Sequence, residues 1–210
     1  MRTRKTGADR KAEIVEATLA LVGELGLDCV STQAVARRVG ITQPGVFRHF
    51  PTKRELWLAV ADWVVAEAER RWAAARKPKE GPLANIGAVI LAQMRFIQDT
   101  PAVSSLIFSR ELHSQNEELR LAFHGMASRF HDLLSRLTGQ AQAAGELPKD
   151  FRPADIANLL LTLTPGLATR WSLSGRAFNL VREGERLSNI LLSCLAKIAG
   201  SRDGASHGEN

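Results

Sequence analysis

The 210-residue chain has only two cysteines, Cys29 and Cys194, and they lie far apart in the sequence. A disulfide framework needs several paired cysteines, so we expect reduced thiols and a cytoplasmic protein. No stretch reaches the roughly 18 consecutive apolar residues that suggest a membrane-spanning helix. The basic start, MRTRKTGADRK, is not followed by an apolar segment, so it does not predict a secretory signal.

Sequence motifs of the common enzyme classes are also missing. There is no glycine-rich phosphate loop, no HExxH and no GxSxG serine elbow. His124 and His131 share one face of a predicted helix, but seven residues separate them by about 10.5 Å along its axis. One metal ion with ligand distances of about 2 Å cannot bridge that gap. We therefore expect neither an enzyme nor a cofactor, and no metal site.

Positive charge is concentrated at the amino terminus. The net charge is +6, and residues 1–11 hold five basic side chains against one acidic one. A basic arm over residues 1–8 would lie along DNA phosphates, where each contact releases counterions and adds salt-dependent affinity. The alternative is a solvated, flexible tail that contacts nothing.

Helical periodicity runs through the whole chain, and no segment predicts a strand, so we expect an all-α fold. Pro165-Gly166 should kink the helix that contains it. We predict the arm over 1–8, a DNA-binding domain over 9–55, an effector-binding and dimerisation domain over 56–199, and a disordered tail over 200–210. The expected helices cover about 9–25, 32–39, 43–50, 52–76, 83–99, 101–112, 115–144, 153–174 and 178–199.

The segment STQAVARRVGITQPGVFRHFPTKRE, residues 31–55, predicts two short helices joined by a tight turn. Ser31 and Thr42 are suitable helix caps, and Gly40 supplies the backbone freedom for the turn. Each helix has two apolar residues four positions apart on one face: Val35 and Val39, then Val46 and Phe50. This pattern is typical of a helix-turn-helix, which places its second helix in the major groove of DNA.

Over residues 1–60 the chain closely resembles the TetR family of bacterial repressors. The resemblance rests on VARRVGITQPGVFRHFPTKREL, with its run Phe47-Arg48-His49-Phe50 and the following Lys53. The rest of the chain agrees with the family only in length and in its all-helical pattern. The resemblance implies a three-helix head on a larger helical domain, with these DNA-facing residues: Thr32, Gln33, Thr42, Gln43, Pro44, Gly45, Phe47, Arg48, His49 and Lys53.

The chemistry of these side chains suits DNA. Gln43 can pair with an adenine edge or a phosphate, and Arg48 can fork onto guanine O6 and N7, which is worth about 1–3 kcal/mol of discrimination. His49 can donate to phosphate, or form a hydrogen bond within the head. Phe47 stands where the family often has tyrosine, so this position cannot offer a hydroxyl to phosphate.

The resemblance also implies that the larger domain binds a small effector and forms a homodimer. The apolar candidates favour a hydrophobic or amphipathic effector, although such residues at helical spacing also suit a plain core. The candidate pocket residues are Gln93, Met94, Phe96, Phe108, His113, Phe123, Met126, Phe130 and Trp171. The candidate dimer residues are Leu159, Leu163, Leu167, Leu187, Leu191 and Leu195, and the alternative to a dimer is an interior helix pair of a monomer.

Two hypotheses about function follow. In the first, the protein is a cytoplasmic, nucleoid-associated repressor that a small molecule releases from a palindromic double-stranded DNA operator. In the second, it is an architectural or chromosome-organising DNA-binding protein on the same scaffold, without an effector.

Overall fold

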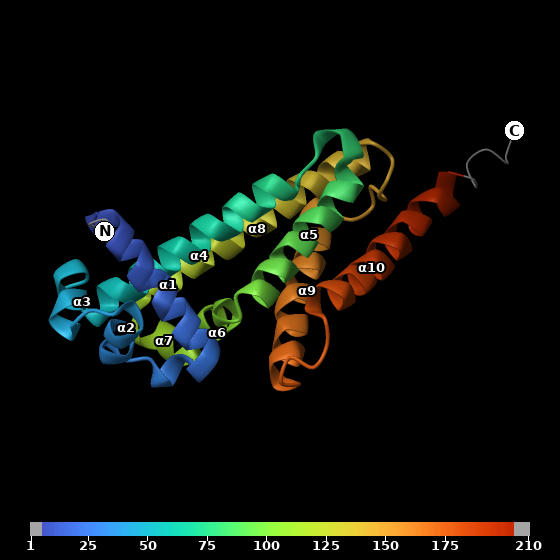
Figure 1. Ribbon diagram of the computed structural model, residues 1–210. Coiled ribbons are helices and arrows are strands. Elements are labelled where there is room, and N and C mark those ends of the chain that lie inside the picture. The colour runs from blue at the N-terminus through green and yellow to red at the C-terminus, as the bar shows by residue number, and fades with distance from the viewer. Residues whose placement is uncertain (1–5, 204–210) are drawn as a thin grey trace, which may run out of the picture. The chain divides into compact units, whose positions relative to one another are not determined.

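The computed structural model describes residues 6–203, with side chains described through Lys197. Within that range the chain forms ten α-helices and two short 3-10 helices, and no strand, which confirms the all-α prediction (Figure 1). No helix there has the length and apolar character needed to cross a membrane. The elements are α1 (Gly7–Leu25), η1 (Leu27–Cys29), α2 (Thr32–Val39), α3 (Gln43–His49), α4 (Lys53–Ala75), η2 (Pro78–Glu80), α5 (Pro82–Asp99), α6 (Ala102–Phe108), α7 (Arg110–Gln115), α8 (Glu117–Ala143), α9 (Pro153–Leu173) and α10 (Leu180–Asp203).

Both ends of the described chain are more helical than predicted. The Thr6 hydroxyl accepts from the Asp9 amide at 3.1 Å, and the Asp9 carboxylate accepts from the Thr6 amide at 3.0 Å. This reciprocal capping box starts α1 at Gly7, so residues 6–8 of the predicted arm belong to a capped helix. At the other end α10 continues to Asp203, past the predicted end at 199. Residues 1–5 of the arm and 204–210 of the tail lie outside the described residues.

The single helix predicted over 101–112 is in fact two helices. Ser109 has φ −73° and ψ 103°, which is extended rather than helical, and its hydroxyl accepts from the Leu112 amide at 3.1 Å. A serine in this conformation ends α6 and caps α7 at once. Pro165, where the sequence predicted a kink, does not end its helix: α9 continues through it to Leu173.

Contacts divide the chain into two compact units, each described by itself. The head unit comprises the described residues through Glu67 together with Asp99–Gly125. The body unit comprises Ala68–Gln98 and the described residues from Met126 onward. The head unit therefore contains α6, α7 and the first turns of α8 as well as the predicted helix-turn-helix.

The core of the head unit explains how its three amino-terminal helices hold together. α1 contacts both α2 and α3, and these two contact each other. Ile14 of α1, Val35 of α2 and Val46 of α3 are each fully buried. Burying such an aliphatic side chain contributes about 1.5–3 kcal/mol, and helices of seven or eight residues depend on this packing because they are unstable alone.

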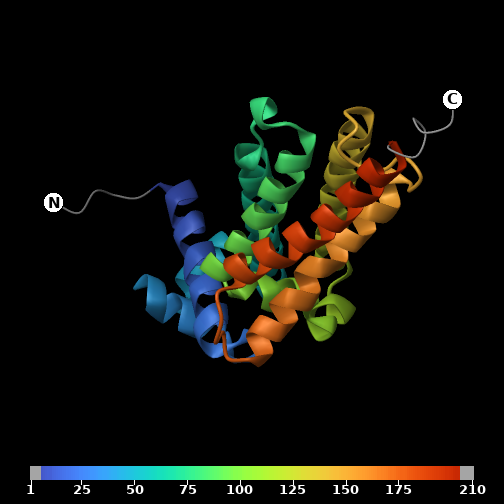
Figure 2. The ribbon, with the colours of Figure 1, turned by 90° about the vertical axis from the view of Figure 1, so that its right-hand side faces the viewer.

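In the body unit, α9 and α10 contact each other and form a hairpin, whose two helices diverge toward the end of α10 in Figure 1 and lie next to each other in the view of Figure 2. The Gln98 side chain accepts from the backbone amide of Leu180 at 2.8 Å, which ties the start of α10 to α5. Gly184 allows close contact at the same junction, since a Cβ there would lie 2.9 Å from Cγ of Met94. A buried bond of 2.8 Å from the Trp72 indole to Gln93 links α4 to α5.

Candidate nucleic-acid interface

The turn between α2 and α3 has the geometry that the sequence predicted. Ser31 caps α2 by accepting from the Ala34 amide at 3.1 Å. α2 ends at Gly40, whose φ of 74° and ψ of 36° are left-handed. The Ile41 amide then donates back to the Ala36 carbonyl at 3.0 Å, which satisfies the end of the helix. The chain can therefore turn sharply into α3.

α3 has one inward and one outward face. Its cap is Thr42, whose hydroxyl accepts from the Gly45 amide at 3.2 Å. Val46 is fully buried and Phe50, just after the helix, is 5% exposed, so both face the core. A Cβ at Gly45 would lie 3.3 Å from the capping hydroxyl, so this position has little room for a side chain. The remaining side chains of α3 are left on the other face.

On that outer face Gln43, Pro44, Phe47 and Arg48 are exposed, and His49 is half-buried. The Arg48 guanidinium makes no hydrogen bond or ion pair with any residue that the structure describes. A guanidinium without an internal partner keeps all five of its donors for a ligand. This is the arrangement that reading a guanine edge requires.

The structure joins two predicted DNA-contacting residues that the sequence treated separately. The Gln43 amide donates a hydrogen bond of 2.8 Å to the Thr32 hydroxyl. Thr32 is the first residue of α2 and Gln43 the first of α3, so the bond links the starts of the two helices. Sequence reasoning missed this pair because the bond depends on how the helices pack.

Cations near the helix-turn-helix differ in whether they are already paired. Arg38 forms an ion pair with Glu24, which lowers the pKa of that carboxyl group and raises the pKa of the guanidinium. Arg37, its neighbour, is exposed and has no ion-pair partner in the described part of the chain. Lys53 begins α4, with its ammonium 6.0 Å from the centroid of the Trp57 ring. Arg37 is thus a candidate phosphate contact that the site prediction omitted, whereas Arg38 is already paired with Glu24.

Of the other predicted DNA-facing residues, Gln33 and Thr42 are exposed, and Thr32 and Gly45 are half-buried. All ten belong to the head unit and to α2, α3 or the residues that begin α3 and α4. The structure therefore gathers the whole predicted set on one substructure.

The nine predicted effector-contacting residues are divided between the two units. Phe108, His113 and Phe123 belong to the head unit, and the others belong to the body unit. Met94 and Phe96 are fully buried, and the remaining body residues are at most 5% exposed: Gln93, Met126, Phe130 and Trp171. Phe130 stacks on Trp72 with ring centroids 4.6 Å apart, and Trp171 donates to the Phe178 carbonyl at 2.9 Å. These contacts are those of a packed core.

The predicted dimer residues divide by exposure. Leu159 is 53% exposed, whereas Leu167 and Leu195 are buried within the chain itself. Leu163, Leu187 and Leu191 are half-buried. Ile190, which the prediction omitted, is 51% exposed on α10. α9 and α10 therefore each carry an exposed apolar side chain that the rest of the described chain does not cover.

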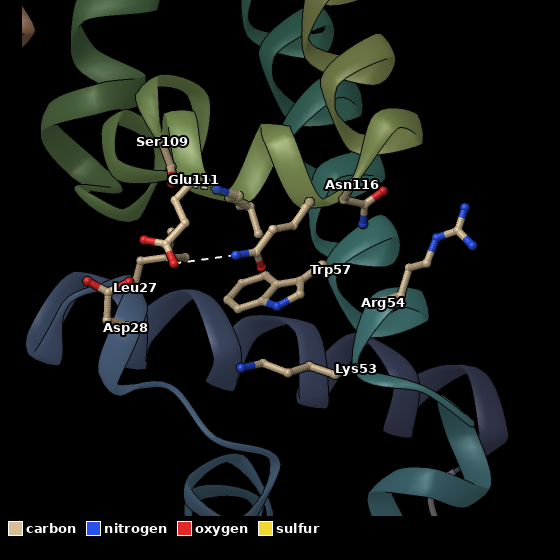
Figure 3. A pocket seen from close by; sticks show the side chains of 10 residues that line it. Leu27, Asp28, Lys53, Arg54, Trp57, Ser109, Glu111 and Asn116 are labelled. Atoms are coloured by element: carbon tan, nitrogen blue, oxygen red, sulfur yellow. Dashed lines mark hydrogen bonds between the residues drawn. The ribbon is translucent and has the colours of Figure 1, made fainter.

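A cavity of about 450 Å³ lies within the head unit, where η1, the start of α4 and α7 meet (Figure 3). None of the nine predicted effector residues lines it. Its wall includes Lys53, one of the predicted DNA contacts, and Trp57.

The three-helix head, whose α3 buries one face and exposes the other, defines a helix-turn-helix DNA-binding regulator. Two family models match the chain: that of bacterial regulatory proteins of the tetR family over residues 14–60, and that of the C-terminal domain of BetI-type transcriptional repressors over residues 82–200. The chain belongs to the TetR family, whose members are DNA-binding regulators rather than enzymes.

Curated relatives and solved structures agree with this assignment. The nucleoid occlusion factor SlmA of Marinomonas sp. is 21% identical over 158 residues, which cover 75% of this chain and 80% of the relative. SlmA of Marinobacter nauticus is 24% identical, over 70% of this chain and 74% of the relative. A TetR transcription regulator from Haloarcula marismortui has the same fold, with a TM-score of 0.78 and 18% identity over 90% of this chain and 98% of that one. So does a transcriptional regulator from Saccharomonospora viridis solved in complex with choline, with a TM-score of 0.77 and 18% identity over 89% and 96% of the two chains.

Proposed function

We propose that the protein is a homodimeric repressor that binds a palindromic operator and is released from it by a small-molecule effector. The observation that carries this proposal is the outer face of α3, where Arg48 is exposed and unpaired beside a Gln43 that Thr32 holds in place. α3 buries one face in the head and exposes polar side chains on the other. Exposed side chains on such a helix can form hydrogen bonds with base edges in the major groove.

A dimer would fix the spacing between two copies of α3 and therefore the form of the operator. Two recognition helices related by a two-fold axis enter successive major grooves about 34–36 Å apart, so the operator should be palindromic. Leu159 and Ile190 support pairing through the α9–α10 hairpin, because a second copy would cover both exposed side chains. The pair of hairpins would form a four-helix bundle.

An effector would act by favouring a state in which the two recognition helices are wrongly spaced. The match to BetI-type repressors and the choline bound to a regulator of the same fold support a small-molecule effector for this chain. The apolar candidates of the body unit favour a hydrophobic or amphipathic one. Opening a site among such buried side chains requires some of them to repack, which would change the body unit on binding.

The experiment that tests the DNA-reading role begins with genome-wide mapping of binding sites, which supplies the operator. Fluorescence anisotropy with that duplex then compares two variants of the full chain. Arg48→Ala should weaken operator binding by about 1–3 kcal/mol, and it should relax the base preference at one operator position. Lys53→Ala should weaken binding to all sequences and reduce the slope of log affinity against log salt by about 1.

Arg95→Ala is the matched control, because Arg95 is exposed on α5 in the body unit and should leave operator affinity unchanged. If Arg48→Ala retains both its affinity and its base preference, α3 does not read DNA through this residue. Titrating hydrophobic and amphipathic metabolites into the operator complex tests the effector, since one compound should release the protein.

The alternative is an effector-independent role in chromosome organisation. The curated relatives named as nucleoid occlusion factors favour it, although they are only distantly related to this chain. The two functions predict different distributions of binding sites in the genome. A few sites beside regulated genes, with release by one compound, support the repressor, whereas many dispersed sites and no releasing compound support the organiser.

A further inference from the structure

The cavity in the head unit has the size of a small-molecule site. Its volume of about 450 Å³ lies within the range of roughly 300–1,000 Å³ that is usual for ligand pockets. All its lining residues belong to the head unit, from η1, the first turns of α4 and the α6–α8 region. None of its lining residues is among those predicted to contact an effector.

The charges around the cavity are unevenly distributed. Figure 3 shows the carboxyl groups of Asp28 and Glu111 at one end, with the Arg54 guanidinium pointing to the opposite end. Asp28 has no hydrogen bond or ion pair with a described residue, and the Glu111 carboxylate accepts only from the Gln115 amide, at 3.4 Å. Arg54 is already paired with Glu118 at 2.7 Å, outside the lining. The acidic end thus has two carboxylates whose charge no ion pair neutralises.

An aromatic face lies between the two ends. Trp57 is only 6% exposed, and Figure 3 shows its indole in the middle of the cavity. The ammonium of Lys53 is 6.0 Å from the centroid of this ring, so a positive charge can reach it. An indole face and unpaired carboxylates both attract organic cations, which carry a positive charge and an apolar surface together.

We propose that this cavity binds a small organic cation, an alkylammonium or quaternary ammonium compound. Its charge would lie near Asp28 and Glu111 and its alkyl part against Trp57. The two lining carboxylates outnumber the one lining cation that lacks an ion pair, Lys53, which favours a cation over an anion.

Occupancy of the cavity has a consequence for DNA binding, and this step rests on the proposed role of Lys53 as a phosphate contact. A bound cation competes with the Lys53 ammonium for the Trp57 ring, and the like charges repel Lys53 toward solvent. Both effects leave Lys53 more available to phosphate, so operator affinity rises. This increase in operator affinity is the opposite of the decrease expected from an effector that binds the body unit.

Isothermal titration of the full-length protein at constant ionic strength tests the site without DNA. The probes are tetramethylammonium and butylammonium chloride, with sodium acetate as the anion. Both cations should bind the wild type, and D28N/E111Q should weaken that binding by roughly fivefold or more. Glu16→Gln, which removes an exposed carboxylate of α1 outside the cavity, should bind like the wild type. Failure of both cations to bind at millimolar concentration, equal binding by D28N/E111Q, or preference for acetate would overturn the proposal.

Operator affinity with and without tetramethylammonium, against sodium chloride at the same concentration, tests the coupling. The cation should tighten operator binding by the wild type, and Lys53→Ala should abolish this gain while binding the cation at least as tightly. A gain that persists in Lys53→Ala would overturn the coupling. A wild type that binds its operator but neither cation refutes the cavity proposal alone, whereas one that binds the cations but no duplex refutes the proposed function.

Discussion

Thr32 and Gln43 show how one hydrogen bond can prepare a side chain for recognition. The Gln43 amide nitrogen has two hydrogens, and one is donated to the Thr32 hydroxyl at 2.8 Å. The other hydrogen and the amide oxygen remain for a base, in a fixed orientation. A side chain that is already ordered loses less entropy when it binds.

Thr32→Val should therefore reduce discrimination at the base that Gln43 is proposed to contact. The expected loss is about 0.5–1.5 kcal/mol, the usual net value of a neutral hydrogen bond. Thr32→Ser keeps the hydroxyl and should restore discrimination. Competition binding with operators substituted at each position measures this. An equal loss of affinity for every duplex would instead assign Thr32 a phosphate contact alone.

At the scale of the element, the turn between α2 and α3 depends on the backbone of Gly40. Its φ of 74° lies in the left-handed region, where a side chain costs about 1–2 kcal/mol. Gly40→Ala should lower the free energy of unfolding by that amount, measured by urea denaturation at fixed protein concentration. Gly87→Ala is the control, since Gly87 lies within α5, has open space around it, and should gain up to about 1 kcal/mol. A Gly40→Ala protein as stable as the wild type would show that the turn tolerates a side chain.

The α9–α10 hairpin contains a second element-scale feature, a shared ion pair. Glu183 of α10 accepts from Arg186 at 2.9 and 3.0 Å and from Arg170 of α9 at 2.7 Å. Bonds to Arg186 first, and then to Arg170, lower the pKa of Glu183 to about 2. A lowered carboxyl pKa stabilises the folded state above the usual value of 4.5, and this contribution is lost as the pH falls toward 2.

Glu183→Gln should thus lower the melting temperature at neutral pH, and the difference from the wild type should shrink as the pH falls below 4.5. Thermal melts across that range measure it. Glu185→Gln, on the same helix but without an ion-pair partner among the described residues, should show no such convergence. If the gap for Glu183→Gln is independent of pH, the ion pairs do not contribute as proposed.

For the whole molecule, the proposed dimer makes a prediction about assembly. Leu159→Glu with Ile190→Glu places two charges on the hairpin and should give a monomer in sedimentation experiments. Loss of the second half-site contact should weaken operator binding by roughly 10²-fold or more. Leu121→Glu is the control, because Leu121 is 50% exposed on the part of α8 that belongs to the head unit. A double variant that remains dimeric would place the interface elsewhere.

The sequence alone determined the helix-turn-helix and the all-α class. Ser31, Gly40 and Thr42 act on backbone groups within a few residues of themselves, and apolar spacing sets which face of each helix is buried. Such short-range effects can be recognised from the amino-acid sequence alone. The same reasoning missed the break at Ser109, because the apolar pattern there continues through a residue whose backbone is extended.

Only the tertiary structure decided how side chains distant in sequence meet. It paired Arg38 with Glu24 and left Arg37 unpaired, and it buried Leu167 while exposing Leu159 on the same helix. It also brought three separate segments together around Trp57. Local preferences cannot specify such contacts, because they arise when helices pack to bury apolar surface and the crossing of the helices sets which side chains come within reach.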